Sequence, residues 1–163
     1  MDDFGTVEAC RIGVEERAAL GAVALATHDL DEWIGYAIEE VAAPGSRNAP
    51  RNRRAPLGVK IKCLDDAVSA VLEERKSPAI CDWRALVDRL TALAEDRNHF
   101  VHSKWAFEGT FGELVARKAQ AAGEPIVRPV AIEELHAIAL RAQTLREEML
   151  VAVLVLTGQV RRV

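Results

Sequence analysis

The residues best suited to chemistry are gathered in one short segment, between Glu95 and Trp105. Two of the chain's four histidines, His99 and His102, stand there beside Arg97 and Asn98. Histidine titrates near neutral pH, so it can give or take a proton, and arginine binds a phosphate through two parallel hydrogen bonds. The segment therefore contains groups that suit proton transfer at a phosphate.

Four helices are expected to position this segment. Apolar residues recur at helical spacing over residues 6–43, over 57–74, from a cap at Ser77 or Asp82 to about Trp105, and over 131–156. Residues 107–130 are interrupted by glycine and proline and contain two short alternating runs, which predicts a small β-hairpin or irregular flap. The expected fold class is all-α, an antiparallel four-helix-type bundle with this insertion before the last helix, in a single domain over residues 1–163.

The three tryptophans are expected to pack in the interior. Trp33 and Trp83 fall on the apolar stripes of their predicted helices, and Val101 continues the stripe of the third helix. Trp105 could stack on a nucleotide base, but packing is the more common role for a tryptophan at the end of such a stripe.

Helical geometry limits how the segment can work. Five residues along a regular α-helix place Arg97 and His102 about 140° apart, whereas Asn98 and His102 share a face. A site that uses both Arg97 and His102 therefore needs a wide cleft, a distorted helix end or a partner subunit.

The stretch Arg97-Asn98-His99-Phe100-Val101-His102 resembles the signature of the HEPN domain superfamily. Its members are small all-α bundles with Arg-x4-6-His late in a helix, usually with a polar residue directly after the arginine. A variant in which His-x-x-Trp and a glycine-containing hairpin follow the motif is similar to residues 102–128. Lys104 stands where some HEPN toxins have a modified tyrosine, so that form of control is not expected.

The resemblance implies a metal-independent endoribonuclease of HEPN type in a toxin or defence setting. It implies His102 as the acid or base, Arg97 as the phosphate clamp and Asn98 as an orienting hydrogen-bonding residue, with no cofactor. It also implies a homodimer with two motifs facing one cleft, and RNA or a protein partner such as an antitoxin as ligands. The alternative is a catalytically silent HEPN-like module that binds a protein partner or RNA, in which Arg97 and His102 are buried in ion pairs.

A metal site is the third interpretation of the same segment. Glu95, His99 and His102 would lie within about 60° on a helix, a spacing that suits a metal-binding stripe. Residues around His28 and His136 could add ligands from other helices. The more common state of a histidine such as His99 is an exposed helical residue.

Residues 47–62 are basic, although the chain has a net charge of −4. Their cations could steer RNA to the motif, or they could form a solvated loop. With one lysine beside the motif, the candidate RNA-binding residues are Arg47, Arg51, Arg53, Arg54, Lys60, Lys62 and Lys104.

Composition excludes several other classes. The chain has 163 residues, of which 50% are hydrophobic and 28% charged, so it is neither disordered nor of low complexity. Its three cysteines, Cys10, Cys63 and Cys81, are widely spaced and predict reduced thiols in a cytoplasmic protein. Neither a signal peptide nor a membrane-spanning stretch is expected.

Overall fold

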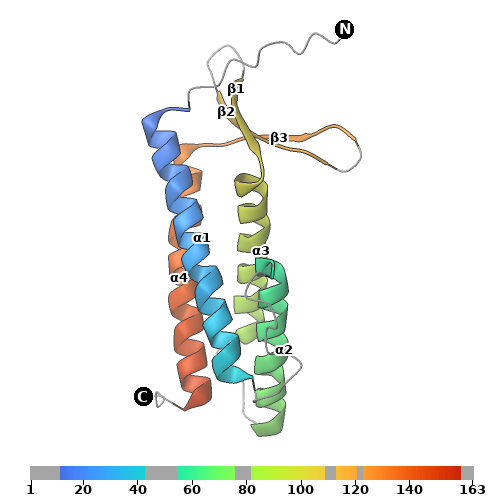
Figure 1. The fold of residues 1–163 in the computed structure, drawn as a ribbon. Coiled ribbons are helices and arrows are strands. Elements are labelled where there is room, and N and C mark those ends of the chain that lie inside the picture. The colour runs from blue at the N-terminus through green and yellow to red at the C-terminus, as the bar shows by residue number, and fades with distance from the viewer. Residues whose placement is uncertain (1–11, 43–54, 76–81, 109–112, 121–122, 159–163) are drawn as a thin grey trace.

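The computed structural model describes residues 12–42, 55–75, 82–108, 113–120 and 123–158. Four helices and three strands follow one another along the chain (Figure 1). The helices are α1 (Val14–Val41), α2 (Leu57–Arg75), α3 (Trp83–Val101) and α4 (Ile132–Thr157), and the strands are β1 (Lys104–Glu108), β2 (Glu113–Lys118) and β3 (Ile126–Pro129). The prediction of a helical bundle with a small β insertion before the last helix is confirmed.

The helices do not all alternate in direction. Helices α3 and α4 are antiparallel, since Arg89 meets Glu148 near one end of the pair and Asp96 meets Arg141 nearer the other. Helices α1 and α4 lie side by side and run in the same direction, from the sheet toward the opposite end of the bundle (Figure 1). Their C-terminal ends are therefore close to each other.

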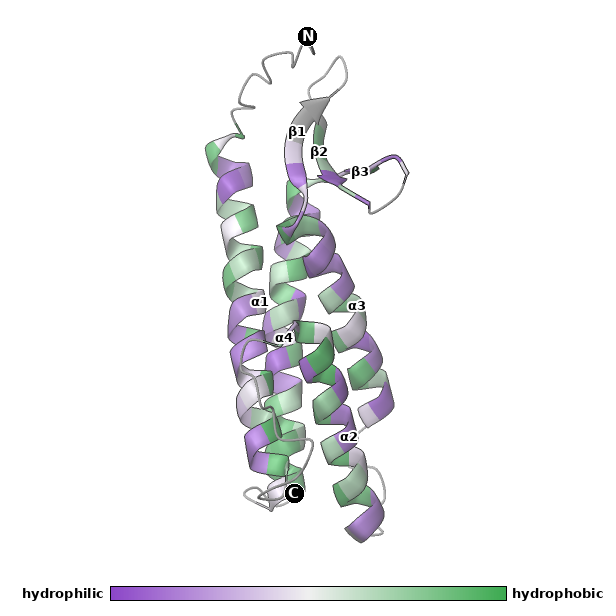
Figure 2. Ribbon diagram, turned by 45° about the vertical axis from the view of Figure 1, so that its right-hand side comes forward, coloured by the Kyte–Doolittle hydropathy of each residue, from purple (hydrophilic) through white to green (hydrophobic). Residues whose placement is uncertain are grey.

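Apolar side chains from all four helices meet in one core. In Figure 2 hydrophilic residues gather along the outer edge of α3. The largest side chains in this core that are less than 2% exposed are Phe100, Leu30, Ile34, Ile38, Leu64, Leu90, Leu93, Leu135, Ile138 and Met149. Burial of one such side chain stabilises the fold by about 1.5–3 kcal/mol, so the helical spacing of the stripes accounts for most of the architecture. Among the described helices, none has the length and apolarity needed to cross a membrane.

Trp83 packs in the core as predicted, and Trp33 does not. Trp83 is 8% exposed, and its indole N–H donates to the Asp65 carboxylate at 2.8 Å. Trp33 is 39% exposed because it lies beside the buried stripe that contains Leu30 and Ile34. Val101, also expected in the core, is 43% exposed.

Helix α3 ends earlier than its periodicity predicts. His102 is the C-cap, with φ −100° and ψ 7°, and Lys104–Glu108 is extended. The Ser103 hydroxyl donates to the carbonyl of His99, and the Trp105 indole N–H donates to the carbonyl of Phe100 at 3.1 Å. These side chains satisfy carbonyls that a further helical turn would otherwise use, so Trp105 lies on a strand.

The insertion is a three-stranded antiparallel sheet in the order β1-β2-β3. Trp105, Ala116 and Arg128 are paired across the three strands and thus share one face. Ala116 is fully buried and belongs to the core, so this face packs on the bundle. Between β2 and β3, Gly123 has φ +103°, a conformation that side chains rarely adopt.

Candidate functional site

The predicted catalytic residues lie at the end of α3 that adjoins the sheet. Arg97 and Asn98 are half-buried in the last turns of the helix, and His102 is exposed at its C-cap. The Arg97 guanidinium donates to the side-chain oxygen of Asn98 at 3.1 Å. His102 directly follows Val101, the last residue of the helix, so a site that uses both Arg97 and His102 still needs a wide cleft or a partner subunit.

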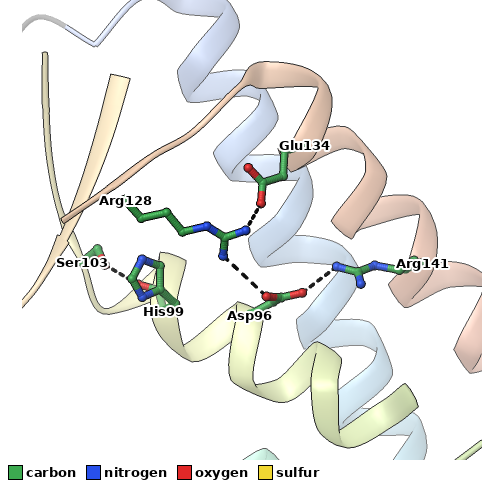
Figure 3. A network of polar contacts seen from close by, with 6 residues as sticks. All are labelled: Asp96, His99, Ser103, Arg128, Glu134 and Arg141. Carbon is green, nitrogen blue, oxygen red and sulfur yellow. Dashed lines mark hydrogen bonds and ion pairs between the residues drawn. The ribbon is translucent and has the colours of Figure 1, made fainter. Parts of the chain in front are cut away.

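Asp96, the residue before Arg97, is held by cations from two other elements (Figure 3). Arg141 of α4 lies 2.6 Å from one carboxylate oxygen of Asp96, and Arg128 of β3 lies 3.7 Å from the other. Arg128 also pairs with Glu134 at the start of α4. The network joins α3, β3 and α4. Asp96, the acid closest in sequence to Arg97, is thus already paired with two other arginines.

Arg97 differs from the other arginines of its helix. Arg84 pairs with Asp88 at 3.5 Å, and Arg89 forms a two-pronged contact with Glu148. Within the described part of the chain, Arg97 has a neutral amide as its hydrogen-bond partner and makes no ion pair. Its positive charge is therefore not offset by a carboxylate there, and a guanidinium suits a phosphate.

Phe100 packs in the core at this end of α3. Its ring is fully buried, Trp105 stacks on it at 5.8 Å between centroids, and the guanidinium carbon of Arg128 lies 5.1 Å from its centroid. Trp105 thus packs, as expected. Arg128 was not among the candidate residues, because its inward orientation follows from the pairing of β3 with β2, which the sequence does not reveal.

His99 is half-buried, unlike the exposed residue expected. Its ring stands edge-on to Phe100 at 5.3 Å, and its Nε2 is buried with no hydrogen-bond partner among the described residues (Figure 3). Burial, and then the positive charges of Arg128 and Lys118, hold the pKa of His99 below its usual value of 6.5.

The structure does not assemble the metal-binding stripe. Glu95 is exposed, His99 is turned toward Phe100, and His102 lies beyond the end of the helix. Within the described ranges, no group of three or more histidine, cysteine, aspartate or glutamate side chains could hold a metal ion.

The residues predicted to bind RNA do not share one environment. Lys60 is 2% exposed, and its ammonium lies 2.7 Å from the Asp31 carboxylate, so it cannot reach RNA and that prediction is wrong. Arg47, Arg51, Arg53 and Arg54 lie outside the described residues.

Two predicted lysines, Lys62 and Lys104, are exposed. Lys104 follows His102 by two residues and pairs in register with Arg117, so both cations are on one face of the sheet. This face is opposite the one with Ala116, which packs on the bundle.

The chain matches no protein-family model, no curated protein and no solved structure. The class of protein is thus defined by its own features, a four-helix bundle with a three-stranded sheet packed against the end of α3.

Proposed function

We propose that the protein is a metal-independent endoribonuclease of HEPN type, with its reaction centre at the C-terminal end of α3. His102 is the acid or base, Arg97 binds the phosphate, and Asn98 orients Arg97. The observation that carries the proposal is that Arg97 is held by the neutral amide of Asn98 while Arg128 and Arg141 occupy the adjacent Asp96.

That arrangement suits an anionic substrate for an electrostatic reason. A guanidinium already paired with a carboxylate must break that pair before it can bind phosphate, whereas Asn98 fixes the side chain without cancelling its charge. The exposed Lys104, two residues beyond His102, adds to the attraction for a polyanion.

RNA is the substrate that needs least from such a site, because it carries its own nucleophile. His102 takes the proton of a ribose 2′-hydroxyl, the 2′-oxygen bonds to phosphorus, and the bond from phosphorus to the 5′-oxygen breaks. A second acid protonates the departing 5′-oxygen, which leaves a 2′,3′-cyclic phosphate and a 5′-hydroxyl. Arg97 stabilises the extra negative charge on the phosphorane. His102 of a second copy supplies the second acid if two motifs face one cleft.

The test is cleavage of a mixed RNA pool in the presence of EDTA. We expect the native chain to cut, and His102→Asn to lower the rate by about 10²–10⁴-fold, the usual contribution of a general acid or base. Arg97→Lys keeps the charge but loses the planar fork, so we expect about 10²-fold slower cleavage. An RNA with a 2′-deoxynucleotide at the mapped site should remain intact.

Matched controls come from the same chain. His28→Asn changes another exposed histidine, and Arg84→Lys changes another arginine of α3, and both should cut at the native rate. Cleavage that EDTA abolishes, or that survives His102→Asn, would refute the proposal. A native chain that binds RNA without cutting it would favour the catalytically silent module instead.

A further inference from the structure

In Figure 1 the second halves of α1 and α4 lie at the end of the bundle opposite the sheet. A hollow lies between them. It is a groove of about 370 Å³. Its wall on α1 includes Trp33, Tyr36 and Glu40, and its floor on α4 includes Met149, Leu150 and Val153. No residue of the proposed ribonuclease centre takes part in it, so the groove needs an explanation of its own.

The aromatic residues of the wall are unusually open. Trp33 is 39% exposed and Tyr36 48% exposed, and their ring centroids lie 5.9 Å apart with the planes at 67°. Both residues line the groove, so a group bound there can contact their rings. A positively charged group is attracted to the face of an aromatic ring by the negative charge density above the ring.

Helix direction adds negative potential at the same place. Glu40 near the end of α1 and Thr157 at the end of α4 both line the groove, because the two helices are parallel. Each helix therefore directs the negative end of its dipole toward this region. The last turn of each helix contains no basic residue, and Glu40 contributes a full negative charge.

The dimensions and lining suit a small molecule. Ligand sites commonly enclose about 300–1,000 Å³ and combine an apolar lining with few polar groups. We propose that the groove binds a small organic cation of the alkylammonium or arylammonium class. Its charged head lies against Trp33, Tyr36 and Glu40, and its apolar body lies on Met149, Leu150 and Val153.

The test is titration of the full chain with benzyltrimethylammonium, followed by the NMR signals of the tryptophan indole N–H groups. We expect a saturable shift of Trp33 and no comparable shift of the buried Trp83. Benzyl alcohol, which is neutral, and phenylacetate, which is negative, should bind more weakly. Glu40→Gln should weaken binding of the cation about threefold, and Trp33→Leu, which keeps an apolar side chain but removes the aromatic face, should weaken it further.

Glu15→Gln is the matched control, because Glu15 is an exposed acid in the first turn of the same helix. It should bind benzyltrimethylammonium as tightly as the native chain does. The proposal is overturned if the three probes bind equally, since the groove would then recognise only apolar surface. It is also overturned if Trp33 shows no saturable shift, or if Glu15→Gln weakens binding as much as Glu40→Gln.

Discussion

Lys60 illustrates how a charged residue can belong to a core stripe. Leu57, Lys60, Ile61 and Leu64 recur at helical spacing along α2, and all four are buried. The ammonium reaches Asp31 of α1, whose side chain is 25% exposed. The pair thus fastens the start of α2 to the middle of α1.

We expect Lys60→Met to lower the free energy of unfolding by about 1–3 kcal/mol. Methionine fills the space, but Asp31 is left as a half-buried carboxylate, a smaller penalty than for a fully buried one. Urea denaturation measures the change. Lys62→Met, two residues away and exposed, should alter stability by no more than about 0.5 kcal/mol. Equal effects of the two variants would contradict a role for the Lys60–Asp31 pair.

His99 makes the fold sensitive to acid. Because its pKa is lowered in the folded state, the unfolded chain binds the proton more readily, so stability increases with pH across this range. The stabilisation is complete above the unfolded value of 6.5 and is lost as the pH falls through the lower folded value. The positive charges of Arg128 and Lys118 disfavour protonation of His99. The negative charges of Asp96 and Glu134 favour protonation, but their effect is smaller.

Unfolding in urea at a series of pH values tests this sign. The native chain should lose stability relative to His99→Gln as the pH falls below about 6.5, because glutamine does not titrate. Groups other than His99 titrate in both proteins and cancel in the difference. A difference that stays constant with pH would show that His99 has the same pKa in both states.

At the scale of elements, Arg128 connects β3 with two helices. It pairs with Asp96 of α3 and Glu134 of α4 and lies over the ring of Phe100. Its side chain is 41% exposed, so solvent screens the ion pairs and each is worth about 0.2–1 kcal/mol. The contact with the ring adds about 0.5–1 kcal/mol.

We expect Arg128→Met to destabilise the sheet by about 1–2 kcal/mol while the bundle stays folded. Hydrogen exchange should accelerate at the Val130 amide, which donates to the Leu114 carbonyl at 2.8 Å. Core amides of α1 and α4 should exchange at the native rate. In Arg128→Lys the Val130 amide should exchange faster than in the native chain and more slowly than in Arg128→Met. Lysine keeps the charge of arginine and loses its planar fork. Uniformly faster exchange throughout the chain would contradict a local role.

Local periodicity was enough to predict four helices but not all of their ends. The start of α2 at Leu57 agrees with its prediction, because apolar spacing reports which face is buried. The end of α3 does not, because Ser103 and Trp105 fold back onto the carbonyls of the helix. Strand β3 has only four residues and exists through pairing with β2, a long-range contact.

The surroundings of the candidate site needed the assembled structure. The Arg97–Asn98 contact joins neighbours in sequence, and the motif spacing identifies both residues. The ion pairs of Asp96 depend on residues 32 and 45 positions away, Arg128 and Arg141, so no local pattern predicts them. Lys60 is the exception, since its place on the apolar stripe was a signal that it is buried.

At the scale of the whole molecule, the two proposed sites occupy opposite ends of the bundle (Figure 1). The end of α3 with its sheet carries the cations that suit RNA, and the ends of α1 and α4 carry the acid and aromatic rings that suit an organic cation. The two sites differ in charge through their side chains and not through helix direction, because both lie at C-terminal ends of helices.

The last prediction concerns the number of chains in one reaction centre. If His102 of two copies supplies the base and the acid, a dimer with one His102→Asn copy lacks one of them. When equal amounts of native and variant chains exchange subunits, about one quarter of the dimers contain two native chains, and the others contain at least one variant chain. Activity should then fall to about one quarter of that of the native chain at the same total concentration. Activity that instead falls to about one half would mean that each chain works alone. Light scattering at the assay concentration, made on the same samples, measures whether the copies are associated.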